Sequence, residues 1–376
     1  YFRTCHAGSI TFWTEYSKSR ASRKEAVKET ASLVVTESDD LLTVNTGKIR
    51  FTVNRKHFAG LEEVWQGDKA CVRGGGPYLV DEKGERYEAA NDEAASVEII
   101  ESGPVRVTIR ATGWYTSAKT KEKLCIFHTL ISAYADQPYV NVTQRTIITY
   151  DTDKGKKLAD VGFAVKPVDA SKWMFGGDGK TTSGDLPAGA GTVWLHQDRG
   201  EHYRLFDGDK SLGEGKRSGG WATTVLKSGS VSVMLRNIWQ LYPKELELGR
   251  DAMTIHFWPK HGRVAFTEQE ELVQANIHEI FYAHQGLLLD LKFPRKYYDA
   301  IKKISPMIER QDENALQANG QGLAMGNDFC LFFNEGAQTD GIAQQAALFN
   351  EPPHAIADPA LSAVTAFSTE EKPVRI

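Results

Sequence analysis

The feature that most constrains the fold is a succession of short runs in which apolar and polar residues alternate. Glycine and proline turns separate these runs, for example Gly74-Gly75-Gly76-Pro77 and Gly103-Pro104. Alternation with a period of two residues is typical of strands that bury one face. The runs cover residues 41–54, 95–100, 105–112, 124–134, 139–149, 161–165, 191–196, 221–227, 231–239 and 252–257. The sequence therefore predicts a mainly β protein in which short antiparallel strands are joined by hairpins and bends.

A few segments lack this alternation. Residues 17–28 and 294–309 each fit a short helix or a charged loop equally well. The region 151–220 is rich in Gly, Asp, Lys and Ser, and we interpret it as long hairpin loops, where binding residues are often found. Near the end, N-E-P-P-H-A-I-A-D-P-A has the proline density of an inter-domain linker.

Charge and hydropathy exclude two classes of partner. The 376 residues include 45 basic and 49 acidic side chains, which give a formal net charge of −4. Such a balance provides no positive field for nucleic acid, so we expect no nucleic-acid partner. No apolar run approaches the roughly 20 residues that cross a bilayer, so we expect no membrane span.

Motifs for metals are also missing. The four cysteines are far apart and form no C-x-x-C pair, and the histidines form no H-E-x-x-H or paired metal spacing. We therefore expect no cofactor of the transition-metal kind. Asp207, Asp209 and Glu214 lie on a glycine-rich loop that could bind Ca²⁺, although solvated turns more often have this composition.

Residues 231–262 combine two strand-like runs with aromatic and proton-handling side chains. Seven residues follow these two strands: Trp239, Gln240, Tyr242, Lys244, Trp258, Lys260 and His261. Flat rings beside donors and a titratable base are the usual means of holding a sugar and moving its protons. We therefore expect a polysaccharide or oligosaccharide partner. Alternatively, the aromatic residues only close the strand ends, with Arg236 and Lys244 in solvent.

The same residues resemble a known family. V-S-V-M-L-R-N-I-W-Q-L-Y-P-K-E-L-E-L followed by H-F-W-P-K-H-G is similar to the central β-sandwich of the exo-rhamnogalacturonan lyase and YetA-like proteins. Further matches lie at residues 46–51, 101–106, 113–114 and 138–142. Residues 6–14, H-A-G-S-I-T-F-W-T, resemble a stretch near the end of the small N-terminal β-barrel of that family.

The resemblance implies a domain plan. Family members consist of a small β-barrel, a central β-sandwich and a C-terminal α/α toroid. By this plan residues 1–38 are the end of the barrel domain, residues 39–350 are the sandwich, and residues 351–376 are a linker toward a toroid that is absent here. We therefore expect the chain to be a fragment of a longer protein. A protein that acts on polysaccharide is expected to be secreted, or to lie at the cell surface or in the periplasm, although residues 1–8 do not read as a signal peptide.

The resemblance also implies an activity, the cleavage of uronate-containing polysaccharide by β-elimination. In such a lyase Arg236, Lys244 and Gln240 would neutralise the uronate carboxylate. His261 and Tyr242 would serve as base and acid. Trp239 and Trp258 would stack on sugar rings, and Lys260 would contact the substrate.

Rival functions remain open. One departure from the family is that Asn327 and Asp328 occupy positions where the resemblance predicts His and Glu, and asparagine does not titrate near neutral pH. That departure favours a non-catalytic carbohydrate-binding or structural β-sandwich. A glycoside hydrolase would instead need two carboxylates about 5 to 10 Å apart. The sequence does not place Glu245, Asp251 or Glu279 that finely.

Overall fold

A computed structural model describes residues 33–152, 156–261, 288–289, 320–335 and 341–352, together with the backbone of residues 2–5 and 9–12. The chain divides into two compact units, Tyr1–Ala31 and Ser32–Ile376. In the first unit β1 (Phe2–Cys5) pairs antiparallel with β2 (Ser9–Phe12). The expected helices at 17–28 and 294–309 and the linker from residue 353 lie outside the described residues.

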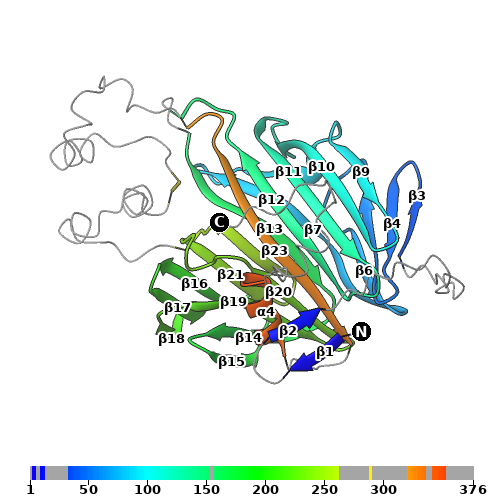
Figure 1. Ribbon diagram of the computed structural model, residues 1–376. Helices are drawn as coiled ribbons and strands as arrows, with labels where there is room; N and C mark the ends of the chain where they lie inside the picture. The colour runs from blue at the N-terminus through cyan, green and yellow to red at the C-terminus, as the bar shows by residue number, and fades with distance from the viewer. Residues whose placement is uncertain are drawn as a thin grey trace, which may run out of the picture. The chain divides into compact units, whose positions relative to one another are not determined.

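The second unit is an antiparallel β-sandwich, which confirms the predicted fold class (Figure 1). In the first of its two layers the strands pair in the order β3 (Val34–Glu37), β4 (Leu41–Asn45), β5 (Arg50–Asn54), β6 (Glu63–Gln66), β7 (Lys69–Asp81), β13 (Leu158–Pro167), β22 (Met253–Trp258), β21 (Lys244–Gly249), β16 (Thr192–Arg199), β17 (His202–Asp207) and β18 (Lys210–Gly215).

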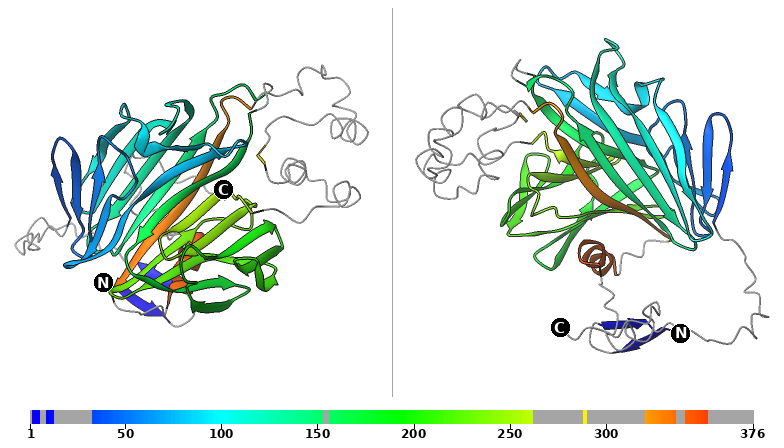
Figure 2. Two further views of the ribbon diagram at one scale, coloured as in Figure 1. Left: turned by 180° about the vertical axis from the view of Figure 1, so that it is seen from behind. Right: turned by 45° about the horizontal axis from the view of Figure 1, so that its top comes forward.

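In the second layer the order is β9 (Ser96–Ser102), β10 (Arg106–Ser117), β11 (Lys123–Tyr134), β12 (Tyr139–Ile147), β23 (Ala324–Glu335), β20 (Gly229–Leu235), β19 (Ser218–Leu226), β14 (Ala170–Gly177) and β15 (Lys180–Asp185). The short β8 (Arg86–Glu88) pairs with both β7 and β10 and so joins the layers, and η1 (Ala89–Asn91) follows it. The helix α4 (Ile342–Asn350) lies against β19 and β20 (Figure 2).

Turn chemistry sets where the strands end. The predicted run 41–54 is two strands in the structure, because Asn45 Oδ1 accepts a hydrogen bond from the backbone N–H of Gly47 at 2.9 Å. Gly47 has a φ of 87°, a conformation that favours glycine. The chain therefore reverses between β4 and β5.

The main core lies between the layers and consists of the apolar half of each alternating strand. Phe163 of β13 meets Phe329 of β23 edge to face, with 5.0 Å between ring centroids. Phe257 of β22 contacts the same ring at 6.1 Å. These aromatic pairs join strands that are far apart in the sequence, and each buried ring stabilises the fold by about 1.5 to 3 kcal/mol.

Alternation also gives the first layer a second, polar face. On β21, Leu246 and Leu248 belong to the core, so Glu245 and Glu247 lie on the opposite face. On β22, Ile255 and Phe257 face the core and His256 does not. The hairpin of β21 and β22 therefore presents charged side chains away from the apolar core.

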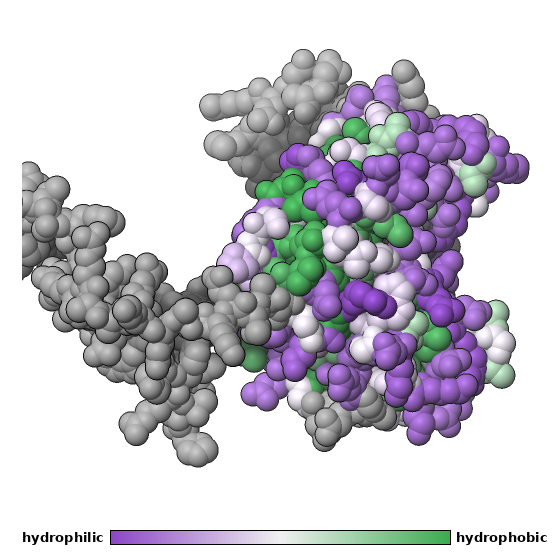
Figure 3. All heavy atoms as spheres, turned by 90° about the vertical axis from the view of Figure 1, so that its right-hand side faces the viewer, coloured by the Kyte–Doolittle hydropathy of each residue, from purple (hydrophilic) through white to green (hydrophobic). Residues whose placement is uncertain are grey.

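The described surface is of ordinary composition. The face seen in Figure 3 is largely hydrophilic, with smaller apolar areas among the polar ones. Val34, Ile100 and Val105 are among the exposed apolar residues. Among the described residues, no helix combines the length and apolar character needed to cross a bilayer.

We expect Phe329→Ala to lower the free energy of unfolding by about 3 to 5 kcal/mol, because the buried ring touches both layers and its removal leaves a cavity. Phe332→Ala on the same strand is the matched control. Its ring is only partly buried and stacks on Tyr139, so the loss should be clearly smaller. Urea unfolding followed by tryptophan fluorescence measures both, and equal losses would contradict a core centred on Phe329.

Candidate functional site

A cluster of buried ionisable side chains occupies the polar face of the first layer. It consists of Tyr78 from β7, Asp160 from β13, His196 from β16, Glu245 and Glu247 from β21, and His256 from β22. Strand pairing brings them together, because Glu245 is the register partner of both His196 and His256. Buried charges are costly unless they are paired, so each charged side chain of the cluster needs an oppositely charged or hydrogen-bonded partner.

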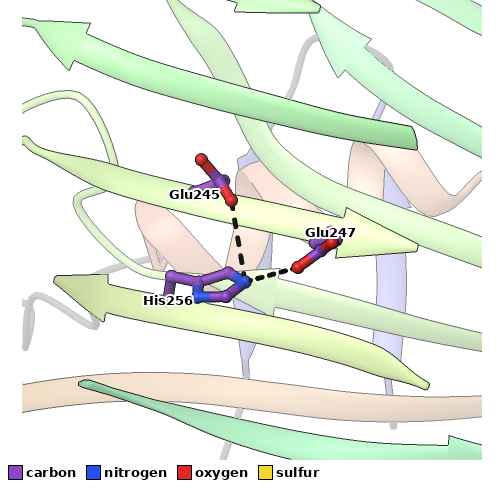
Figure 4. Close-up of side chains that lie close together, drawn as sticks. All are labelled: Glu245, Glu247 and His256. Atoms are coloured by element: carbon purple, nitrogen blue, oxygen red, sulfur yellow. Dashed lines mark hydrogen bonds and ion pairs between the residues drawn. The ribbon is translucent and has the colours of Figure 1, made fainter. Parts of the chain in front are cut away.

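His256 lies at the centre of this cluster (Figure 4). Its Nδ1 donates to Oδ1 of Asp160 at 2.8 Å, and its Nε2 donates to Oε2 of Glu247 at 2.9 Å. Oε1 of Glu245 lies 3.6 Å from the same Nε2. Burial disfavours the charged imidazole, but the facing carboxylates of Asp160, Glu247 and Glu245 outweigh it and raise the pKa of His256 to about 10. The ring is therefore a cation at neutral pH.

Two more histidines hold Glu245. Nδ1 of His196 lies 3.0 Å from Oε2 of Glu245, and Nδ1 of His261 lies 2.7 Å from Oε1. Burial favours the neutral acid, but these hydrogen bonds and the nearby His256 outweigh it and lower the pKa of Glu245 to about 2. Glu245 is thus a carboxylate at neutral pH.

Glu247 is also held as a carboxylate. Its Oε1 accepts hydrogen bonds from Thr192 Oγ1 at 2.7 Å and from Lys260 Nζ at 3.0 Å. Burial opposes ionisation here too, yet the His256 and Lys260 charges keep the pKa of Glu247 well below its usual range. Asp160 likewise has a second partner, because the Tyr78 hydroxyl donates to its Oδ2 at 2.9 Å.

His261 and Lys260 connect the cluster to solvent. The His261 side chain is 27% exposed, and that of Lys260 is 46% exposed. The His261 ring stacks on Trp194 at 4.1 Å between centroids, and Trp194 stacks on Phe206 at 4.4 Å. A carboxylate only accepts hydrogen bonds, so Nδ1 of His261 must hold the proton that faces Glu245. Its Nε2 has no hydrogen-bond partner in the described part of the chain and can act as a base.

A cavity of about 230 Å³ adjoins the cluster at the turn between β21 and β22. The wall of the cavity nearest the cluster is formed by Thr192, Glu247, Thr254 and Lys260. Residues 189–191 and 249–252 complete the lining. A ligand in this cavity would therefore meet the ammonium of Lys260 directly. The charged residues of the lining are Glu247, Arg250, Asp251 and Lys260, so a negatively charged ligand would bind beside Lys260 or Arg250.

The cluster includes a set of atoms that could hold a metal ion. Three side chains each offer one ligand atom, namely Glu245, Glu247 and His256. These three atoms lie within 4.8 Å of one another. A metal ligand must be a neutral imidazole, however, and both nitrogens of His256 donate to carboxylates. Lys260 also covers Glu247. The proton on His256 and the Lys260 ammonium therefore already supply the positive charge that a cation would bring.

The calcium loop predicted from sequence is a hairpin. Asp207 ends β17 and Glu214 lies on β18, where its Oε2 is 3.7 Å from Nε2 of His202. Within the described ranges, these carboxylates do not form a group of three acids close enough to share one ion. Calcium binding at this loop remains a prediction.

The structure places His261 and Lys260 against the cluster, where they bind Glu245 and Glu247, but puts two other predicted site residues inside the molecule. Lys244 points to the core side of β21, and its Nζ donates to the backbone oxygen of Phe257 at 2.7 Å. Burial lowers its pKa to about 7. Trp258 is 2% exposed and packs in the core, where no sugar ring can reach its face. A register shift where β22 pairs with β13 interrupts the alternation that gave Trp258 an outward position.

The structure gives the remaining predicted residues other surroundings. Arg236 donates through Nε and Nη2 to the backbone oxygen of Phe349 and so anchors α4. Trp239 and Gln240 line a different cavity. Tyr242 lies near the turn at Gly200.

Asn327, the departure from the family pattern, is also outside the cluster. It lies on β23 in the second layer, where its register partner is Gln144 of β12. Asp328 beside it accepts a hydrogen bond from Thr143 Oγ1 at 2.7 Å. The proton handling that the cluster can perform therefore does not depend on either residue.

Sequence reasoning missed Tyr78, Asp160, His196, Glu247 and His256 as site residues. One signal was present in K-E-L-E-L-G, where two acids alternate with two leucines and so share one face of a strand. Polar alternation normally indicates a solvated face. Only the register between β16, β21 and β22 shows that these acids meet histidines in a buried place.

Comparison with known proteins assigns part of the chain to a class. Residues 33–169 match the family model of the PcRGLX-like protein central beta sandwich domain, a class of carbohydrate-active β-sandwich. The matched part runs from β3 into the turn after β13 and covers less than half of the chain. No curated protein of similar sequence matches it.

The chain aligns with several solved structures at low similarity. A candidate aldose 1-epimerase from Klebsiella pneumoniae has 11% identity and a TM-score of 0.40, over 85% of this chain and 87% of that one. The α-N-acetylgalactosaminidase NagBb from Bifidobacterium bifidum has 9% identity and a TM-score of 0.43, over 82% of this chain and 39% of that one. A heparan sulfate lyase HepC mutant from Pedobacter heparinus has 9% identity and a TM-score of 0.35, over 82% and 35%. Identities and TM-scores this low say nothing of activity.

The cluster should make stability depend on pH in a defined window. Glu245 has its pKa lowered from 4.5 to about 2, so its contribution is present above pH 4.5 and is lost as pH falls toward 2. His256 has its pKa raised from 6.5 to about 10, so its contribution is full below pH 6.5 and is lost as pH rises through 10. Both contributions are complete between pH 4.5 and 6.5.

Within that window we expect His256→Gln to lower the free energy of unfolding by about 3 to 5 kcal/mol, because it leaves buried carboxylates without their cation. The difference from the wild type should shrink as pH rises toward 10. His57→Gln, at an exposed histidine, is the control and should change stability by less than about 0.5 kcal/mol. Urea unfolding at several pH values measures this, and a difference that grows above pH 7 would contradict a charged His256.

Proposed function

We propose that the protein is a polysaccharide lyase that cleaves a uronate-containing polysaccharide of the rhamnogalacturonan kind by β-elimination. The observation that supports it most directly is the pairing of His261 with buried Glu245, together with the pairing of Lys260 with Glu247 on the same strand. The family match of residues 33–169 supports the substrate class. Action on a polysaccharide also favours a secreted, cell-surface or periplasmic location.

His261 would be the base. Glu245 fixes the proton on Nδ1, which leaves the lone pair of Nε2 for the substrate. When Nε2 takes the proton from the carbon next to the uronate carboxylate, the imidazolium that forms is stabilised by the Glu245 carboxylate. The stack on Trp194 holds the ring in one orientation. Glu245 and Trp194 are positioning residues in this scheme.

Lys260 would neutralise the substrate. Loss of the proton moves negative charge onto the uronate carboxylate, and a fixed ammonium nearby lowers the energy of that state. Lys260 lies on the cavity wall with its charge shared between solvent and Glu247. The electron pair left on carbon then forms the double bond, the bond to the leaving oxygen breaks, and that oxygen takes a proton from the His261 imidazolium or from water.

The rival activities fit the site less well. A glycoside hydrolase needs one carboxylic acid that stays protonated to donate to the leaving group. The pKa of Glu245 and that of Glu247 are both lowered, so neither is a proton donor at neutral pH. A non-catalytic carbohydrate-binding protein is the remaining alternative, and the burial of most of the cluster favours it.

We expect His261→Ala to slow formation of unsaturated product from rhamnogalacturonan by about 100 to 10,000-fold, because a correctly positioned base usually accelerates a reaction by that factor. His202→Ala is a matched control, because His202 is also partly exposed, at 30%, and its Nδ1 lies 2.6 Å from a buried carboxylate, that of Asp198. Its activity should match that of the wild type. The ultraviolet absorbance of the new double bond gives the rate.

If the wild type forms no unsaturated product from rhamnogalacturonan, homogalacturonan or glucuronate-rich gum, the lyase is excluded. Retained binding to one of these polymers would then favour the carbohydrate-binding alternative. New reducing ends without the unsaturated chromophore would indicate a hydrolase.

Lys260→Gln should reduce kcat/KM on the free uronate by about 10 to 100-fold, because its ammonium would be lost from the carboxylate. On methyl-esterified substrate, which has no carboxylate charge, the same variant should lose much less. Lys227→Gln, at an exposed lysine near Asp169, is the control. An equal loss on both substrates would rule out charge recognition by Lys260.

A further inference from the structure

A second cavity, of about 280 Å³, lies where the ends of β14 and β19 meet the loop after β20 and the helix α4. The proposed reaction uses none of its residues. Its lining consists of glycines, aromatic rings and a few polar side chains, and includes Gly176, Gly177, Gly219, Trp221, Trp239 and Gln240. The side chains of each wall are fixed by contacts with other residues of the chain, so the cavity forms without a ligand.

Trp239 is fixed in place by Arg217. The guanidinium carbon of Arg217 lies 4.0 Å from the centre of the indole ring, and Nη2 of Arg217 lies 2.8 Å from Oε1 of Glu201. The backbone N–H groups of Lys216 and Arg217 both donate to the carboxylate of Asp178, at 3.0 and 2.9 Å. The half-buried indole is therefore a platform that carries the guanidinium over one face and packs against the core, and its orientation is set before any ligand binds.

The glycines give the cavity its floor. A Cβ on Gly176 would lie 2.1 Å from Nε1 of Trp221, so only glycine lets that indole lie against β14. Gly220 has a φ of 70°, and a Cβ there would lie 2.8 Å from the backbone oxygen of Leu235. The close packing that these glycines allow fixes the position of the Trp221 indole in the lining.

The helix forms the opposite wall and is anchored at its end. Arg236 donates to the backbone oxygen of Phe349, and Asn350 Oδ1 accepts from the backbone N–H of Asn237 at 2.9 Å. Ala343 and Ala347, two exposed small residues of α4, leave room in front of the platform. The cavity is therefore preformed, which lowers the entropy cost of binding.

We propose that this cavity binds one glycosyl residue of the polysaccharide chain, at a site separate from the His261 centre. Its volume is just below the roughly 300 to 1,000 Å³ of small-molecule pockets, which suits a single sugar ring. Aromatic surface combined with an amide group recognises the apolar face and the hydroxyls of a sugar. Gln240 has no hydrogen-bond partner in the described part of the chain. The polymer is taken from the proposed function, but the binding does not require that the protein be catalytic.

The test is binding of soluble rhamnogalacturonan by affinity gel electrophoresis and calorimetry. Trp239→Ala should weaken binding about 10-fold or more, because it removes the platform. Ala347→Gln should weaken binding by a similar factor, because the larger glutamine side chain would fill the cavity from the opposite wall. Residue 347 is exposed on a helix, so this variant should still fold. Circular dichroism and the thermal midpoint check the fold of each variant.

Trp65→Ala is the matched control. Trp65 is also a half-buried tryptophan under an arginine, with the Arg50 guanidinium carbon 4.6 Å from its ring, but it lines neither cavity. Its binding should equal that of the wild type. Unchanged binding in both Trp239→Ala and Ala347→Gln would overturn the proposal, and so would an equal loss in Trp65→Ala.

The two proposals fail separately. If His261→Ala abolishes product formation while Trp239→Ala and Ala347→Gln both bind normally, the sugar site is wrong and the lyase stands. If neither the wild type nor any variant forms unsaturated product, but Trp239→Ala and Ala347→Gln lose binding, the lyase proposal is wrong and the sugar-site proposal stands.

Discussion

The hydrogen-bonded His256 imidazolium is the interaction on which the polar face of the sandwich depends. It lies between Asp160 and Glu247 and within 3.6 Å of Glu245, on strands that are otherwise held together by backbone pairing. Without this cation, three buried carboxylates would repel one another across β13, β21 and β22. With it, each acid remains ionised, and each can hold a further residue in place.

That arrangement has a chemical consequence at the exposed edge. Glu245 is fully buried and yet charged, so it can hold His261 in one tautomer while the other ring nitrogen faces outward. Glu247 in the same way holds Lys260 at the wall of the neighbouring cavity. The proposed base and the proposed cation are thus each held by an acid that lies in the interior. In the proposed reaction, buried groups would position the reacting ones without a flexible loop.

Sequence reasoning predicted a mainly β protein because alternation and turn residues are local properties that each segment expresses by itself, whereas the β-sandwich was predicted from the family resemblance. It also singled out His261 and Lys260, since both follow directly on a strand. It misjudged Trp258 because a register shift in the pairing of β13 with β22 interrupts the alternation. It gave Lys244 and Arg236 catalytic roles, whereas their donors bind the backbone oxygens of Phe257 and Phe349. Neither partner is visible from spacing alone.

The sequence by itself determined that strands dominate, that one half of each strand is apolar, and that aromatic and basic residues gather after β20 and β22. Only the tertiary structure decided which polar residues meet. Tyr78, Asp160, His196 and His256 come from separate strands, and it is the register of those strands that places their atoms within hydrogen-bonding distance. Register depends on the packing of the whole sheet against its partner layer, which no single segment encodes. The pKa values and the proposed chemistry follow from that register.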